Sequence, residues 1–289
     1  MVSRPYELIE RPDLDSPLLI VALEGWIDAG LGAGNAVASL LEQLDANTVA
    51  VFDADSLLDH RARRPTMHLI DGVNTGLTWP SIELRSAVDP AGNDLLLLVG
   101  AEPDHQWQAF TGAVVDLVVD LGARMALGLG AYPAATPHTR STRLSITAGT
   151  EELADSVGYL RGTIDVPAGV QAAIEQRCAE VGLPAVGLWA QVPHYAAAMP
   201  YAAASAALLE GLNKVGHLTL DTSALDEEAT ATRTRLDALV GDNPEHQQLV
   251  AALEEQHDAM DSSTQGPLPS GDELAAQFQR FLRDNDERS

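Results

Sequence analysis

Apolar runs alternate with amphipathic stretches along the first 220 residues. Four runs rich in Leu, Val, Ile and Ala are typical of strands buried on both faces, and they lie at residues 17–23, 94–100, 124–127 and 184–191. Further strands are predicted at residues 48–53 and 81–88, and the second of these should pair with 94–100 as a hairpin. Helical patterns occupy residues 31–44, 106–121, 167–181 and 201–215. This order predicts an α/β fold, a three-layer α/β/α sandwich with a parallel-dominated mixed sheet.

Two long polar segments interrupt the pattern. Residues 55–74 are expected to form a loop, and a loop of that length in a compact domain is usually functional or part of an interface. Residues 128–143 follow a short strand as a second loop, and Pro133 and Pro137 stiffen it because a proline ring fixes φ and restricts the preceding residue. Open α/β sheets bind ligands at the carboxyl ends of their strands, so this second loop is predicted to carry a site.

The character of the chain changes at residue 221. No strand pattern follows, and helices are predicted at residues 223–240, 244–260 and 271–284, with a linker at 261–267. This part holds sixteen acidic and five basic residues. We expect an α/β domain at residues 1–220 and an acidic helical region at 221–289, which packs on the sheet domain as an exposed cap or covers a partner.

Composition narrows the function. The formal net charge of -25 argues against general binding of nucleic acids or anionic membranes, both of which need a basic surface. The single cysteine, Cys178, excludes a disulfide framework and a cysteine metal site, and it is expected to be a small core residue. With no apolar signal segment at the N-terminus and no apolar run long enough to span a bilayer, we expect a cytoplasmic protein.

Catalytic patterns are weak. The run Gly30–Gly34, with Asp53 roughly twenty residues on, partly matches a dinucleotide fingerprint, but the preceding turn is bulky and acidic. The histidines lack metal-ligand spacing, and there is no Gly-x-Ser-x-Gly elbow. Asp28, Asp53 and Glu102 could serve acid-base chemistry in a cleft at the strand ends. No catalytic residue, metal site or cofactor is assigned.

The arginines offer a second kind of site. Five of the seventeen basic residues lie in the two polar loops, namely Arg61, Arg63, Arg64, Arg140 and Arg143. If both loops reach one edge of the sheet, they make a positive patch that could hold a phosphate or carboxylate, together with His138 and Thr139. The alternative is that the arginines pair with carboxylates across a protein interface, which we favour because the planar guanidinium bonds carboxylates bidentately.

Several segments in order resemble the proteasome assembly chaperone family, in the branch similar to its second subunit and of the actinobacterial type. They include Leu23-Glu24-Gly25-Trp26-Ile27-Asp28-Ala29-Gly30, Arg61-Ala62-Arg63-Arg64-Pro65, Gly100-Ala101-Glu102-Pro103-Asp104, Pro137-His138-Thr139-Arg140 and Val192-Pro193-His194-Tyr195. The resemblance implies a nucleoside phosphorylase-like α/β/α sandwich without an established catalytic site.

The same resemblance implies a function. It suggests a non-enzymatic, homo-oligomeric scaffold, a trimer by our expectation, whose partners would be further copies of itself and proteasome subunits or other proteins. The alternative is an enzyme or a small-anion or nucleoside-binding protein that uses the cleft at the strand ends. Two positions depart from the family pattern. Ser141 stands where a proline is usual, and the chain ends Asp286-Glu287-Arg288-Ser289 rather than in a hydrophobic-Tyr-x tail.

Overall fold

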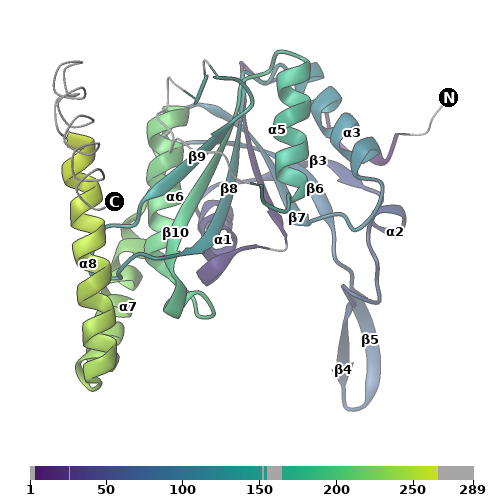
Figure 1. Cartoon of the computed structure of the whole chain (residues 1–289). Coiled ribbons are helices and arrows are strands. Elements are labelled where there is room, and N and C mark those ends of the chain that lie inside the picture. Colours follow the sequence, from purple (N-terminus) through teal and green to yellow (C-terminus); the bar gives the residue numbers. More distant parts are fainter. Residues whose placement is uncertain (1–3, 26, 152, 155–164, 266–289) are drawn as a thin grey trace, which may run out of the picture.

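The computed structural model describes residues 4–25, 27–151, 153–154 and 165–265, and its centre is one eight-stranded sheet (Figure 1). The strand order is β1-β3-β6-β7-β2-β8-β10-β9. The strands are β1 (Tyr6–Leu8), β2 (Leu18–Glu24), β3 (Asn47–Phe52), β6 (Ile82–Val88), β7 (Asp94–Ala101), β8 (Met125–Ala134), β9 (Leu144–Ala148) and β10 (Ala185–Pro193). Strands β7, β2, β8 and β10 are parallel, and β3 shares their direction because β6 is antiparallel to both of its neighbours. The mixed, mainly parallel sheet of the sequence prediction is confirmed.

Helices cover both faces of this sheet. They are α1 (Gly32–Gln43), α3 (Trp107–Asp120), α5 (Val170–Glu180) and α6 (Ala202–Gly216), with short turns η1 (Ala29–Leu31), α2 (Ala54–Leu57) and η2 (His194–Ala196). Strand β2 explains the layering, because Leu18 and Ile20 join the core beneath α1 and α6, whereas Leu19 and Val21 join the core beneath α3 and α5. Successive strand residues point to opposite faces, so an unbroken apolar run serves two cores at once.

The polar segment 55–74 is not the loop that we expected. Its second half and the residues after it form a separate two-stranded sheet, β4 (Thr66–Ile70) and β5 (Val73–Thr78). Asp71 and Gly72 make the tight turn, with φ of 49° and 81°. That geometry is the Asp-Gly hairpin turn, whose twist matches that of the flanking strands. The β4–β5 hairpin projects away from the body (Figure 1).

Strand β8 is also longer than predicted and continues to Ala134 rather than ending at Leu127. The glycines that suggested an early end lie inside the strand because they make room for neighbours. A Cβ built on Gly128 would fall 2.3 Å from Gln171, and one on Gly130 would fall 2.4 Å from Trp189. The loop that carries Pro137 to Arg143 is therefore shorter and better anchored than the sequence indicated.

The acidic C-terminal region contributes two described helices, α7 (Ser223–Gly241) and α8 (Pro244–Gln265), which lie along one side of the molecule (Figure 1). Leu225 and Leu236 of α7 belong to the core beneath α6. The predicted helix at 271–284 lies outside the described residues. Within the described residues, no helix combines the length and apolar character needed to cross a bilayer.

Candidate functional site

The loop of residues 137–143 is held from below by Tyr195, which follows β10 in η2. The Tyr195 hydroxyl accepts the backbone N–H of His138 at 2.9 Å and lies 2.7 Å from His138 Nδ1. The two rings meet edge to face, with their centroids 5.7 Å apart. His138 is only 3% exposed. The side chain that looked like a site histidine in the sequence is therefore a buried anchor that fixes the loop.

Acidic side chains of α7 and α8 close over the same loop. Asp237 of α7 lies 3.1 Å from His138 Nε2. Arg140 donates to both oxygens of Asp258, each at 2.8 Å, and to Glu254 at 3.0 Å. Thr139 donates to Glu254 as well. The result is a polar interface between the loop and acidic residues of two helices that lie 99 or more residues later in the sequence.

Arg143 completes this interface from the far end of the loop. It donates to the carbonyl oxygen of His257 at 2.7 Å. Hydrogen bonds from Arg140 hold the pKa of Asp258 below its usual range, and the pKa of Arg140 is raised in turn. His138, Thr139, Arg140 and Arg143 are thus brought together by the structure, at an interface within one chain.

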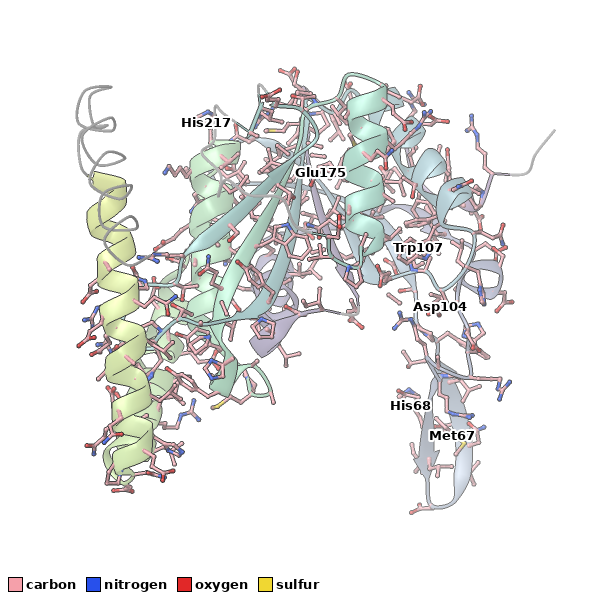
Figure 2. The ribbon with its side chains drawn as sticks, viewed as in Figure 1. Met67, His68, Asp104, Trp107, Glu175 and His217 are labelled. Carbon is pink, nitrogen blue, oxygen red and sulfur yellow. The ribbon has the colours of Figure 1, made fainter. Side chains whose placement is uncertain are left out.

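The other three arginines lie elsewhere. Arg61, Arg63 and Arg64 lie at the base of the β4–β5 hairpin, where Arg63 pairs with Asp104 at 3.4 Å and the other two are exposed. Their loop follows β3, and β6, β7 and β2 separate β3 from β8. Asp104 and the hairpin are on the opposite side of the molecule from α8 (Figures 1 and 2). The two arginine loops do not come together.

The β4–β5 hairpin is unusual because every residue in both strands is exposed. Figure 2 shows Met67 and His68 well away from the body. Its apolar side chains are 43% exposed or more, with 52% for Met67, 57% for Leu69, 63% for Val73 and 43% for Leu77. Soluble monomers rarely present a contiguous apolar surface of this kind without an interaction to cover it.

Of the three acidic residues predicted at the cleft, Asp28 and Glu102 lie near each other and Asp53 lies apart from them. Asp28 accepts the backbone N–H groups of Ala33 and Gly34 at 2.8 and 2.9 Å, at the start of α1. Burial raises the pKa of Asp28 in spite of these bonds. Glu102 is buried and accepts the N–H of Val170 at 2.6 Å. Asp28 and Glu102 line a common small cavity of about 30 Å³, whereas Asp53 is exposed at the start of α2.

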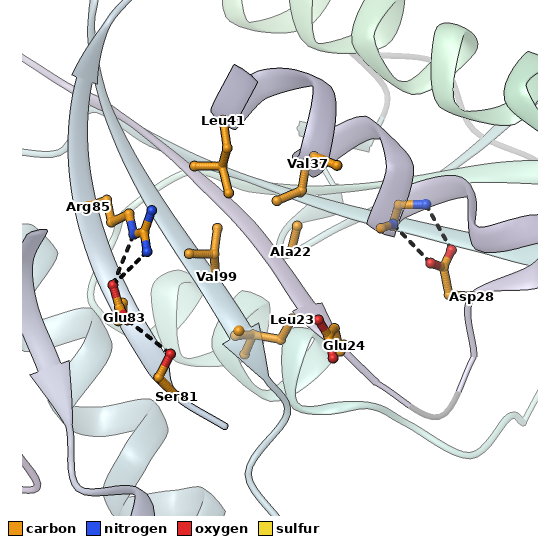
Figure 3. A pocket seen from close by; sticks show the side chains of 14 residues that line it. Ala22, Leu23, Glu24, Asp28, Val37, Leu41, Ser81, Glu83, Arg85 and Val99 are labelled. Atoms are coloured by element: carbon orange, nitrogen blue, oxygen red, sulfur yellow. Dashed lines mark hydrogen bonds and ion pairs between the residues drawn. The ribbon is translucent and has the colours of Figure 1, made fainter. Parts of the chain in front are cut away.

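A larger groove lies between α1 and the sheet, as Figure 3 shows. Its volume is about 280 Å³, and its lining combines apolar residues of α1 and the sheet with the polar side chains of Glu24, Asp28, Ser81, Glu83 and Arg85. The Asp28 carboxylate occupies the amide groups at the start of α1, where the partial dinucleotide pattern would place a phosphate. Within the described part of the chain, no three metal-ligating side chains form a group. This edge of the sheet is therefore poorly arranged for a nucleotide.

Two sets of residues were missed by sequence reasoning. One is the row of acidic groups on the C-terminal helices, Asp237, Glu254 and Asp258. The spacing of Glu254 and Asp258 by four residues was a readable signal, because such residues share one face of a helix. The other set is the apolar side chains of the hairpin, for which the Asp71-Gly72 turn was the readable signal.

The chain is similar to several known proteins in sequence and in fold. The sequence pattern of the PAC2 family matches residues 22–240. A Corynebacterium glutamicum protein of unknown function is 33% identical, with a TM-score of 0.83 over 89% of this chain and 98% of that one. A Mycobacterium tuberculosis protein of unknown function is 38% identical, with a TM-score of 0.82 over 90% and 91%. A proteasome-assembly chaperone homologue from the same species is 30% identical, with a TM-score of 0.75 over 81% and 99%. Among curated proteins, none matches the chain.

Proposed function

Because the chain belongs to the PAC2 family, we propose that it is a non-enzymatic, homo-oligomeric scaffold that binds other proteins in a chaperone-like way. The similarity to a proteasome-assembly chaperone homologue supports the chaperone-like role. The observation that carries the scaffold role is the exposed apolar hairpin. The lone cysteine, buried as a thiol, is compatible with the reducing cytoplasm in which we place the protein.

The hairpin supports self-association for two reasons. An isolated two-stranded hairpin is at best marginally stable in water, so β4 and β5 gain stability if another chain covers them. Arg61 and Arg64 at its base are also positive, whereas the chain carries a net charge of -25. A basic, apolar projection is attracted to the acidic body of a second copy. When such a head-to-tail contact closes on itself it makes a ring, and we propose a trimer.

The partners beyond self are proposed to be proteasome subunits or other proteins that assemble on the scaffold. Co-purification from the native lysate tests this part. The chain should enrich proteasome subunits or another assembly, and the enrichment should fall when the hairpin is altered. A preparation that enriches no assembly contradicts the chaperone-like role even if the protein is a trimer.

The oligomer is tested by the mass in solution, from light scattering on a sizing column. Wild-type protein should elute with the mass of three chains, and the double variant Leu69→Lys/Val73→Lys should elute as a monomer. This monomeric variant should still unfold with a cooperative thermal transition, because neither side chain packs in the core. Val119→Lys is the matched control, since Val119 is a similarly exposed apolar residue on α3. A wild-type monomer, or an unaltered mass in the double variant, overturns self-association through the hairpin.

The alternative of a small-anion or nucleoside site is not favoured. Arg140 already binds two carboxylates of the same chain, and the second arginine loop is four strands away. A thermal-shift screen with nucleosides, phosphate and carboxylates separates the two hypotheses, because a ligand that binds only the native state raises its melting temperature. A clear rise in melting temperature with any of these compounds would support the alternative of a ligand site in the cleft at the strand ends.

A further inference from the structure

Helix α8 is attached to the body mainly through polar groups. From Pro244 to Ala259, only Val250, Leu253 and His257 are buried, and the remaining side chains are half-buried or exposed. The ion pairs to Arg140 are themselves partly open to solvent, with side chains 30% to 54% exposed. Exposed ion pairs are weak and are screened by salt. We therefore expect α8 to be attached more weakly than α7, whose Leu225 and Leu236 belong to the core beneath α6.

The body side of this contact does not depend on α8 for its shape. The hydrogen bonds of His138 to Tyr195 hold the loop from beneath, and both residues belong to the α/β domain. Thr139, Arg140 and Arg143 then project from an anchored backbone. Removing α8 leaves two arginines and a hydroxyl group exposed in a fixed arrangement on an acidic molecule.

The Arg140 side chain contacts one particular face of α8. Glu254 and Asp258 are four residues apart, so they lie on one face, and Arg140 binds both. Val250, Leu253 and His257 lie on the buried side of the same helix. The pattern is an amphipathic helix with two carboxylates one turn apart beside an apolar stripe.

We propose that Thr139, Arg140 and Arg143 form a receptor for an acidic amphipathic helix, and that α8 is its intramolecular occupant, which an acidic helix of a partner protein displaces. The charge of the receptor favours this occupant over a basic or neutral one. The connection at residues 242–243, between Gly241 at the end of α7 and Pro244 at the start of α8, provides the point about which α8 can swing away while α7 stays packed. The proposal does not rest on the oligomeric state or on the proteasome.

The test uses a fluorescent peptide with the sequence of residues 244–265 and the full-length protein. In the opened variant Glu254→Lys/Asp258→Lys, lysines face Arg140 and release α8. The peptide should bind this variant about tenfold or more tightly than wild type, because an attached helix competes at an effective concentration of about a millimolar. Adding Arg140→Glu to the opened variant should abolish the gain.

The matched control is Glu245→Lys/Glu255→Lys, which makes the same change of charge on exposed residues of α8 that have no described contact with the loop. It should behave as wild type, and a polyglutamate peptide of equal charge should bind the opened variant weakly. Equal binding to wild type and both double variants, binding that persists with Arg140→Glu, or no binding to a folded opened variant each overturns the proposal.

A second measurement covers the case in which the opened variant does not fold. Hydrogen–deuterium exchange of wild-type α8 should speed up as NaCl rises, while β2 stays protected, and the free peptide should speed it further. If α8 stays as protected as β2 at high salt and with excess peptide, α8 is a fixed part of the fold and the receptor is not available. If a second copy of the protein speeds up the release of α8 and the peptide does not, the two copies exchange their α8 helices. That result also overturns the proposal.

Discussion

The hydroxyl group of Tyr195 anchors the start of the 137–143 loop. Tyr195 Oη accepts the His138 N–H and shares a second hydrogen bond with the His138 ring, and the His138 side chain is almost completely buried. A buried N–H that loses its acceptor keeps the full cost of leaving water. The desolvated phenol also has its pKa raised to about 12, so it stays protonated and available as a donor at neutral pH.

Tyr195→Phe should therefore destabilise the protein by about 1–3 kcal/mol, because the ring remains while two buried hydrogen bonds are lost. The change is measured as the shift in free energy of unfolding from urea titrations. Tyr132→Phe is the matched control. It removes one hydroxyl that bonds Ser145 in a half-buried position, and it should cost below about 1 kcal/mol. Equal costs for the two variants would show that His138 finds another acceptor.

Cys178 gives an independent probe of the core. Burial, with a smaller contribution from Glu175, raises the pKa of its thiol to about 11, and the side chain is 0% exposed. The thiolate is the reactive form, so the native protein should not react with an aromatic disulfide reagent near neutral pH. Reaction should occur only through opening of the core beneath α5, and its rate should rise in urea. Immediate stoichiometric labelling without denaturant contradicts the packing of α5.

At the level of elements, acid should release α8 before it unfolds the sheet. Arg140 lowers the pKa of Asp258 relative to the unfolded chain. A carboxyl group of this kind stabilises the docked state above its unfolded pKa of about 4, and the contribution is lost as pH falls through the lowered value. Exchange of α8 amides should therefore accelerate below about pH 4 while amides of β2 remain protected.

A variant separates this effect from general acid unfolding. Asp258→Asn removes the titrating carboxylate, so α8 should be looser at neutral pH and show a weaker dependence on acid. Glu255→Gln has no described partner in the loop and should leave the pH profile unchanged. If Asp258→Asn follows the wild-type profile, the bidentate pair with Arg140 does not hold α8.

The sequence predicted elements where a local pattern carries the information. Strand β2 was readable because both of its faces are buried, which forces an unbroken apolar run. The β4–β5 hairpin was missed because neither face reaches a core, so its apolar residues follow no burial pattern and only the Asp71-Gly72 turn marked it. Strand β8 was cut short because its glycines suggest a loop unless their neighbours, Gln171 and Trp189, are known.

The candidate site was predicted in part for a related reason. Pro137 to Arg143 stood out as a stiff basic loop, but the acidic groups that it binds lie 99 to 118 residues later in the chain. Helical periodicity shows that Glu254 and Asp258 share a face, and it does not show which surface that face meets. The pairing of distant segments depends on how the whole domain folds, and one sequence carries no direct record of it.

Charge organises the molecule as a whole. The acidic body repels other copies, whereas the basic loop of residues 137–143 attracts the acidic α8 of its own chain. The proposed hairpin contact combines apolar side chains with arginines at the base. The two interfaces therefore differ in their dominant force, and salt acts on them differently.

Raising NaCl from about 0.05 M to about 0.5 M should strengthen the oligomer and weaken the docking of α8. Screening reduces the repulsion between bodies of charge -25, and the apolar contacts of Leu69 and Val73 are not weakened by it. The same screening reduces the attraction of Arg140 for Glu254 and Asp258. Sedimentation equilibrium reports the first effect and hydrogen exchange of α8 the second, on one set of samples. Dissociation of the oligomer with rising salt would mean that Arg61 and Arg64, rather than the apolar hairpin, hold the copies together. Unchanged exchange of α8 would mean that the buried side chains of Val250, Leu253 and His257 outweigh its ion pairs.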